Sequence, residues 1–74
     1  MTTLNKRLCE LREERGLTIR QMSVESGIPE STIKQVSYYR VDVRATTLVD
    51  FADFFGVSMD YLFGRTDVRE VARD

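Results

Sequence analysis

The sequence predicts an all-α protein, a compact bundle of five short helices. Two observations predict this class. Its one proline, Pro29, and its four glycines divide the chain of 74 residues into segments of helical length. Within these segments apolar residues recur every three or four positions, and the alternation typical of strands does not appear. The glycines are Gly16, Gly27, Gly56 and Gly64.

The first predicted helix covers about residues 3–15. Leu4, Leu8 and Leu11 have the spacing of one apolar stripe, and the charged residues lie mostly off it. Gly16 follows the segment and suits a left-handed stop at its C-terminus. Cys9 lies beside the stripe, so we expect a small buried packing residue there rather than a redox group.

The second predicted helix covers about residues 19–26. Thr18 and Gln21 have the spacing of a capping box, in which each side chain bonds the backbone N–H of the other residue. Met22 is the expected inward anchor, and Gly27 ends the helix. The third predicted helix covers about residues 29–37, with proline in its first turn, where a missing N–H has no consequence.

The fourth and fifth predicted helices cover about residues 46–55 and 59–63. The fourth carries an apolar stripe of Leu48, Phe51, Ala52 and Phe55. Phe54 falls off this stripe, and we expect it either at the core edge or in a dimer surface. Ser58 is the expected cap of the fifth helix. The residues expected to close the core there are Tyr61, Leu62 and Phe63.

The last stretch, residues 66–74, is mostly charged. Val68, Val71 and Ala72 could line one face of a short helix, which would need a docking surface because it is too short to be stable alone. We therefore assign residues 1–66 to one domain and residues 67–74 to a short charged tail.

Composition argues against several classes of protein. One cysteine and no histidine leave neither an internal disulfide nor a structural zinc site to be expected. The chain lacks a Cys/His pair and a Gly-rich phosphate loop, so we expect no enzyme, no metal and no cofactor. Apolar runs are only a few residues long and no signal peptide is seen, so we expect no membrane partner and a reducing, cytoplasmic location.

The net charge of −1 is unlike that of a typical nucleic-acid-binding protein, but the charges are unevenly spread. Residues 1–44 carry eight Lys and Arg against six acidic residues, a net of +2. Residues 45–74 carry three arginines against six acidic residues, a net of −3. Residues 1–44 are therefore suited to contact phosphate groups, and residues 45–74 to face solvent or a partner.

The stretch from Ile19 to Tyr38 has the pattern of a helix-turn-helix, two short helices joined by a turn that contains glycine. Ser23 supplies the small residue required where the helices touch, and Gly27 supplies the positive φ of the turn. The apolar residues expected to pin both helices to the core are Met22, Ile28, Ile33 and Val36. Ile33 and Val36 form one narrow apolar edge of the third helix, so most of its surface is polar.

These residues and their flanks resemble the phage Cro/repressor-like (Xre-type) helix-turn-helix family, whose fold is called lambda-repressor-like. The matching segments read RLCELREERGLTIRQMSVESGIPESTIKQV and TTLVDFADFFGVSMDYLFGRTD, so the resemblance covers about residues 4–67. It implies that the second helix lies over the DNA backbone and the third in the major groove. Double-stranded DNA is then the expected partner, bound by a homodimer whose recognition helices lie roughly 34 Å apart.

The resemblance places base reading on the first turn and the exposed side of the third helix. Gln35 is suited to a bidentate contact with adenine, and Lys34 to guanine or a phosphate. Ser31 and Thr32 are suited to a base or a phosphate oxygen. Glu30 either accepts from cytosine or is only favoured by the positive end of the helix dipole. Pro29 shares this surface.

Backbone contacts are expected on either side of the third helix. Arg20, Arg40 and Arg44 are expected to meet phosphate groups, which set register rather than sequence. Tyr38 and Tyr39 are expected to divide between the core edge and the sugar-phosphate wall. The expected DNA-binding residues are therefore Arg20, Glu30, Ser31, Thr32, Lys34, Gln35, Tyr38, Arg40 and Arg44.

The chain also departs from the family pattern. Ile19 stands where the family has a glutamine, and Ser37 stands where it often has a glutamate paired with the arginine that corresponds to Arg12. The loop SYYRVDVRA lacks the usual glycine and proline. Ile19, Glu30 and the acidic balance favour an alternative, a protein-interaction module of the same fold, anti-repressor or antitoxin-like, with a protein partner and weak DNA binding.

Overall fold

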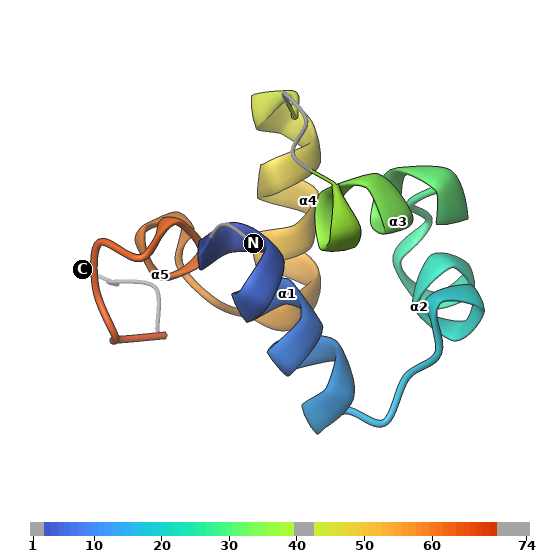
Figure 1. The fold of residues 1–74 in the computed structure, drawn as a ribbon, viewed down its shortest axis with the longest axis horizontal. Helices are drawn as coiled ribbons and strands as arrows, with labels where there is room; N and C mark the ends of the chain where they lie inside the picture. The colour runs from blue at the N-terminus through green and yellow to red at the C-terminus, as the bar shows by residue number, and fades with distance from the viewer. Residues whose placement is uncertain (1–2, 40–42, 70–74) are drawn as a thin grey trace.

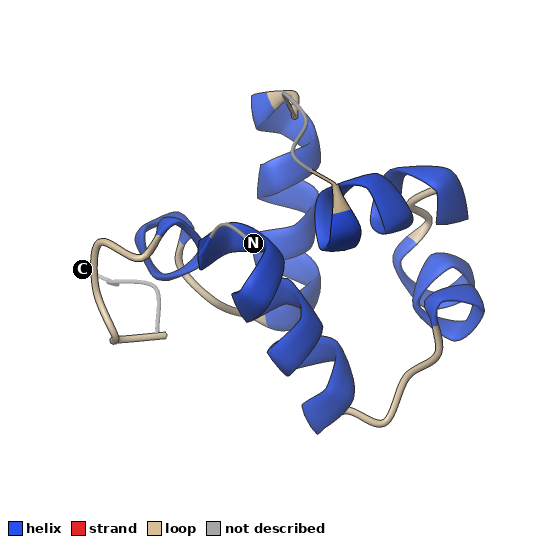
Figure 2. Cartoon of the chain, in the orientation of Figure 1, coloured by secondary structure: helices blue, strands red, loops and turns tan. Residues whose placement is uncertain are grey.

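The computed structural model describes residues 3–39 and 43–69, and every regular element within these ranges is an α-helix (Figure 2). The elements are α1 (Thr3–Glu14), α2 (Ile19–Ser26), α3 (Glu30–Tyr38), α4 (Ala45–Phe55) and α5 (Met59–Phe63). The predicted all-α class with five helices is confirmed.

The five helices are arranged as two end groups with a pair of helices between them. Helices α2 and α3 lie together at one end of the molecule, and α5 lies at the other, with α1 and α4 between them (Figure 1). Helix α1 packs against α3 and α5, and α4 packs against α2 and α5. None of the helices that the structure describes is long and apolar enough to cross a membrane.

The helix ends follow the local chemistry of the sequence. The predicted capping box of α2 is confirmed: the Gln21 N–H donates to Thr18 Oγ1 at 3.1 Å, and the Thr18 N–H donates to Gln21 Oε1 at 2.8 Å. Ser58 caps α5 by accepting from the Tyr61 N–H at 3.0 Å. Pro29 differs from the prediction, because it is the extended N-cap of α3 (ψ 143°) rather than its first helical residue.

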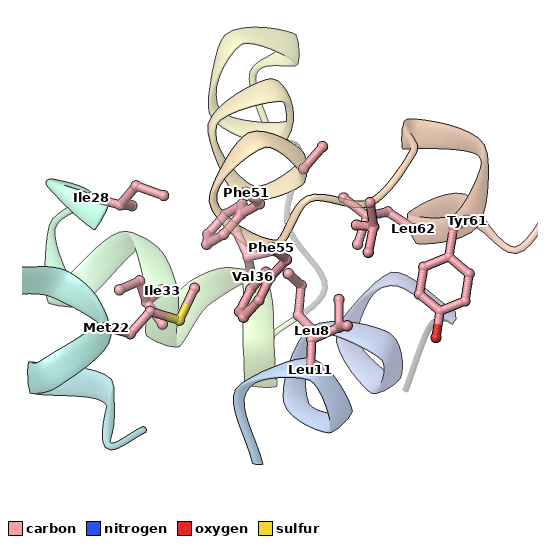
Figure 3. Close-up of a cluster of buried hydrophobic side chains, with 12 residues drawn as sticks. Leu8, Leu11, Met22, Ile28, Ile33, Val36, Phe51, Phe55, Tyr61 and Leu62 are labelled. Carbon is pink, nitrogen blue, oxygen red and sulfur yellow. The ribbon is translucent and has the colours of Figure 1, made fainter. Parts of the chain in front are cut away.

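The core lies where all five helices meet (Figure 3). Phe51 and Leu62 are fully shielded from solvent at its centre. Its members are Leu8, Leu11, Met22, Ile28, Ile33, Val36, Phe51, Ala52, Phe55, Val57, Tyr61 and Leu62. The expectation that Phe63 closes the core is wrong, since its side chain is 46% exposed. Helix α5 has only five residues, and its buried positions are Tyr61 and Leu62.

Residues 65–69, here called the return segment, run back from α5 to α1 without forming a helix. The Ser58 N–H donates to Arg69 O at 2.7 Å, and Arg7 donates to Thr66 O at 2.7 Å and to Asp67 at 2.8 Å. The helix considered for residues 66–74 is thus absent from the described part, residues 66–69. Val71 and Ala72 lie outside the described residues.

Candidate nucleic-acid interface

The turn between α2 and α3 is held by glycine geometry and by serine hydroxyls. Gly27 has a φ of 78°, in the left-handed region, and its N–H donates to Ser23 O at 2.9 Å. The Ser23 hydroxyl donates to Ile28 O at 2.6 Å, and the Ile28 N–H donates to Ser26 Oγ at 3.1 Å. Ser23 is therefore more than a small residue at the crossing, because its hydroxyl ties α2 to the residues that lead into α3.

The orientation of α3 is set by its buried edge. Ile33 and Val36 lie in the core, with Met22 of α2 packed beside them (Figure 3). The opposite side of the helix is open to solvent, and Thr32 at its margin is partly buried. We name this side the reading face. It consists of five exposed residues that share one helical face: Glu30, Ser31, Lys34, Gln35 and Tyr38.

A polar stripe of α1, formed by Asn5, Cys9 and Arg12, runs along the C-terminal end of α3. The Asn5 side-chain amide donates to Val36 O and, at 3.3 Å, to Tyr39 O. Cys9 Sγ donates to Ser37 O at 3.7 Å. The last carbonyls of a helix lack partners within it, so these donors stabilise the end of α3 and fix its position relative to α1.

Sequence reasoning missed this stripe because it followed only the apolar one. Asn5, Cys9 and Arg12 have the same i, i+4, i+7 spacing as the neighbouring leucines. Asn5 is only 5% exposed, whereas Cys9, expected to be a small buried packing residue, is half-buried. Burial raises the pKa of the Cys9 thiol, although the nearby Arg12 opposes this shift.

Arg12 lies at the junction of α1, the loop before α2, and α3. One of its terminal nitrogens donates to Leu17 O at 2.7 Å, and the other donates to the Tyr38 hydroxyl at 3.4 Å. Its Nε is buried, with no hydrogen-bond partner among the described residues. Within the described residues no carboxylate forms an ion pair with Arg12. Ser37, which stands where the resemblance implies a glutamate, is buried.

The remaining cations fall into two groups. Arg7 and Arg69 hold the return segment, and Arg15 lies over the Phe54 and Phe55 rings at 5.1 and 5.0 Å from their centroids. The second group has side chains without a hydrogen bond or ion pair among residues 3–39 and 43–69. It comprises Lys6, Arg20, Lys34, Arg44 and Arg65. Three of the four cations expected to meet DNA belong to it, and the fourth, Arg40, lies outside the described residues.

The aromatic side chains differ partly from expectation. Tyr38 and Tyr39 are 51% and 63% exposed, so the predicted division, with one of them at the core edge, is wrong. Tyr38 ends α3 on its exposed face, and the chain leaves the helix at Tyr39 in extended backbone, so neither ring packs on the core. Phe54 is partly buried against the core, with its ring centroid 5.0 Å from that of Phe55, so the core-edge alternative describes its place.

The described residues contain no group of three or more His, Cys, Asp and Glu side chains arranged to hold a metal ion. The arrangement offers an exposed polar helix face whose opposite edge is buried in the core and whose C-terminal end is bonded to α1. A family model described as helix-turn-helix matches residues 10–62, from the middle of α1 to α5. Neither curated proteins nor solved structures gave a significant match.

Proposed function

Because the chain belongs to the Xre/Cro-like helix-turn-helix family of DNA-binding transcription regulators, we propose that it is a repressor that binds a near-palindromic operator as a homodimer. In this proposal α3 enters the major groove and α2 lies over the sugar-phosphate backbone. The observation that carries the proposal is the reading face of α3, which is open to solvent while the opposite edge of the helix is anchored in the core.

The chemistry of the reading face suits base recognition. We assign Gln35 to a bidentate contact with adenine and Lys34 to guanine O6 and N7 or to a phosphate. Ser31 and Thr32 bond a base edge or a phosphate oxygen. Glu30 accepts from cytosine N4, or it lies near the phosphates and favours the start of α3 through the helix dipole.

Backbone contacts are assigned to the cations that the fold leaves unused. Arg20 at the start of α2 and Arg44 at the N-cap of α4 are exposed, and these two helices precede and follow α3 in the chain. We also assign Tyr38 to a backbone contact because it ends the reading face. Arg40 is assigned to a backbone contact from the sequence pattern alone. These groups set the register of the protein on DNA and add affinity for any sequence.

Two copies would present their reading faces to successive major grooves, roughly 34 Å apart. The dimer surface is proposed in the C-terminal third, around α5 and the residues that follow it. Exposed apolar side chains support this choice, since Phe63 and Val68 both lie open to solvent. Two-fold symmetry of the dimer would then require a near-palindromic operator.

A selection of random duplexes at controlled salt tests the proposal. The expected result is a near-palindromic consensus bound with an affinity that falls steeply as salt rises, in proportion to the phosphates neutralised. If the selection enriches no consensus, and all random duplexes bind equally weakly at low salt, the proposed function is contradicted.

The second candidate is a protein-interaction module of the same fold, anti-repressor or antitoxin-like. The net charge of −1 and the carboxylate of Glu30 on the reading face favour it, as does Val24, an exposed apolar side chain on α2. Under this proposal the duplex selection fails to enrich a consensus. The wild-type protein instead captures a protein partner, and Val24→Asp abolishes that capture.

A further inference from the structure

The Tyr38 hydroxyl lies at the end of the reading face and is already bonded on its inner side. Arg12 donates to it from Nη2 at 3.4 Å. A phenolic hydroxyl has one hydrogen and accepting lone pairs, whereas a guanidinium has donors only. Arg12 therefore uses a lone pair of Tyr38 and leaves the hydroxyl hydrogen for a group that accepts but does not donate.

Arg12 is well placed to act on whatever Tyr38 contacts. Its position is fixed by the bond to Leu17 O at 2.7 Å, and its charge has no carboxylate partner within the described residues. The guanidinium has five N–H donors, and its buried Nε has no hydrogen-bond partner in the part of the chain that the structure describes. A bound anion would supply the negative charge that the protein itself does not place beside this cation.

The end of α3 that carries Tyr38 is held against α1. Asn5 bonds the carbonyl oxygens of Val36 and Tyr39, which lie on either side of Tyr38, and Cys9 bonds the carbonyl of Ser37. The backbone around Tyr38 thus contacts α1 at three residues. An exposed phenol on a fixed backbone, bonded to a fixed cation, presents its hydroxyl hydrogen in a limited range of directions.

We propose that Tyr38 and Arg12 form a clamp for one DNA backbone phosphate, in which Tyr38 donates its hydroxyl hydrogen to a non-bridging phosphate oxygen and Arg12 acts through Tyr38 as the positioning residue. This inference rests on the proposed DNA-binding function. The phosphate makes this bond charge-assisted, which is stronger than a neutral hydrogen bond, and Arg12 polarises the hydroxyl that donates it.

The test compares Tyr38→Phe with Tyr39→Phe on the selected duplex, using duplexes in which single phosphates are replaced by uncharged methylphosphonates. Both substitutions remove one hydroxyl from neighbouring exposed tyrosines, but only the Tyr38 hydroxyl is bonded to Arg12. At one phosphate in each half-site, wild-type protein and Tyr39→Phe should lose about tenfold in affinity on methylphosphonate substitution. Tyr38→Phe should start about tenfold weaker and lose nothing further at that phosphate.

Arg12→Met should reproduce the pattern of Tyr38→Phe at the same phosphate, and the double variant should be no weaker than either single one. Thermal unfolding confirms that each variant is folded. If Arg12→Met does not fold, Arg12→Lys replaces it. Its single ammonium cannot bond Leu17 O and the Tyr38 hydroxyl with the forked geometry of a guanidinium, so a partial loss of affinity confined to that phosphate is expected.

The clamp is refuted if the affinity of Tyr38→Phe responds to methylphosphonate substitution as that of wild type does at every phosphate. It is also refuted if Arg12 variants lower the affinity for all methylphosphonate duplexes to the same degree. Either result, obtained with a wild-type protein that still prefers its consensus, leaves the proposed function intact. A wild-type protein without preference for any duplex would instead overturn the proposed function itself.

Discussion

Glu14 and Arg69 stand 55 positions apart in the chain, yet two hydrogen bonds of 2.7 and 2.6 Å join the carboxylate to the guanidinium. Arg69 also donates from Nε to the Tyr61 hydroxyl at 3.1 Å. The Arg7 guanidinium also lies over the Tyr61 ring, 4.1 Å from its centroid. The return segment is thus attached to both α1 and α5, and two arginines lie over the Tyr61 ring of α5.

The first prediction is that this pair makes stability depend on pH in the acid range. The hydrogen bonds from Arg69 hold the pKa of Glu14 below its ordinary value of 4.5. A lowered pKa in the folded state stabilises the protein fully above 4.5, and this contribution disappears as pH falls through the lower folded value. Unfolding curves of wild type and Glu14→Gln should therefore differ slightly at neutral pH and converge in acid. A constant difference across the whole range would contradict this.

The second prediction separates two contacts of the same arginine. Arg7 donates to the carbonyl oxygens of Tyr61 and Thr66 at 2.5 and 2.7 Å and to the Asp67 carboxylate at 2.8 Å. The Arg7 side chain is 16% exposed, whereas that of Asp67 is 98% exposed. Arg7→Met should lower the free energy of unfolding by about 2 kcal/mol, because carbonyls lose their donors.

Asp67→Asn is the matched control for Arg7→Met. It removes the charge of an exposed ion pair and leaves both carbonyl bonds, so denaturant unfolding should detect little or no loss. Equal losses in the two variants would show that the ion pair, rather than the backbone contacts, holds the return segment.

The third prediction concerns two glycines with nearly the same backbone. Gly27 has φ +78° with nothing within 4 Å of an added Cβ, whereas Gly64 has φ +80° and its Cβ would lie 2.7 Å from Thr3 Cγ2. Gly27→Ala should lower the unfolding free energy by about 1 kcal/mol through the backbone alone. Gly64→Ala should lower it further, and Thr3→Ser, which deletes that methyl group, should remove the excess. Equal losses without the rescue would argue against the contact.

The fourth prediction concerns Asn5, the buried polar residue of α1. Asn5→Ala should lower the unfolding free energy by about 2 kcal/mol, because two carbonyl oxygens at the end of α3 lose a donor. Asn5→Asp should be more damaging, since a carboxylate would then face carbonyl oxygens at the negative end of the α3 dipole. Chemical denaturation of the two variants decides this, and an aspartate variant more stable than the alanine variant would contradict the assigned role.

Much of the fold could be predicted because its signals are local. The bounds of α2 and α5 follow from a hydroxyl at the N-cap and a glycine after the last turn, both readable in the sequence. The reading face follows from the position of Ile33 and Val36, since burial of that narrow edge leaves the polar residues of the opposite side to solvent.

The missed features depend on contacts between residues distant in the chain. Nothing near Arg7 in the sequence indicates that it contacts Tyr61, 54 positions further along the chain, and nothing near Arg69 indicates that it bonds Glu14, 55 positions away. Phe63 has the residue type of a core position, but the direction of a five-residue helix depends on what it packs against. Asn5 could have been suspected from its spacing with Cys9 and Arg12, yet only the packing of α1 on α3 makes it buried.

The salt dependence of binding separates the two kinds of DNA contact proposed here. Arg44→Ala should weaken binding to every duplex alike and lower the slope of log affinity against log salt by about one, because one phosphate contact is lost. Gln35→Ala removes no charge, so its slope should equal that of wild type.

The most direct test of the account is the affinity of wild type and Gln35→Ala for the selected duplex and for duplexes with single base-pair changes. We expect Gln35→Ala to lose about tenfold discrimination at one base pair in each half-site and to keep its discrimination at the others. If Gln35→Ala discriminates at every position as wild type does, or if wild type binds all the duplexes equally, the reading face does not read DNA.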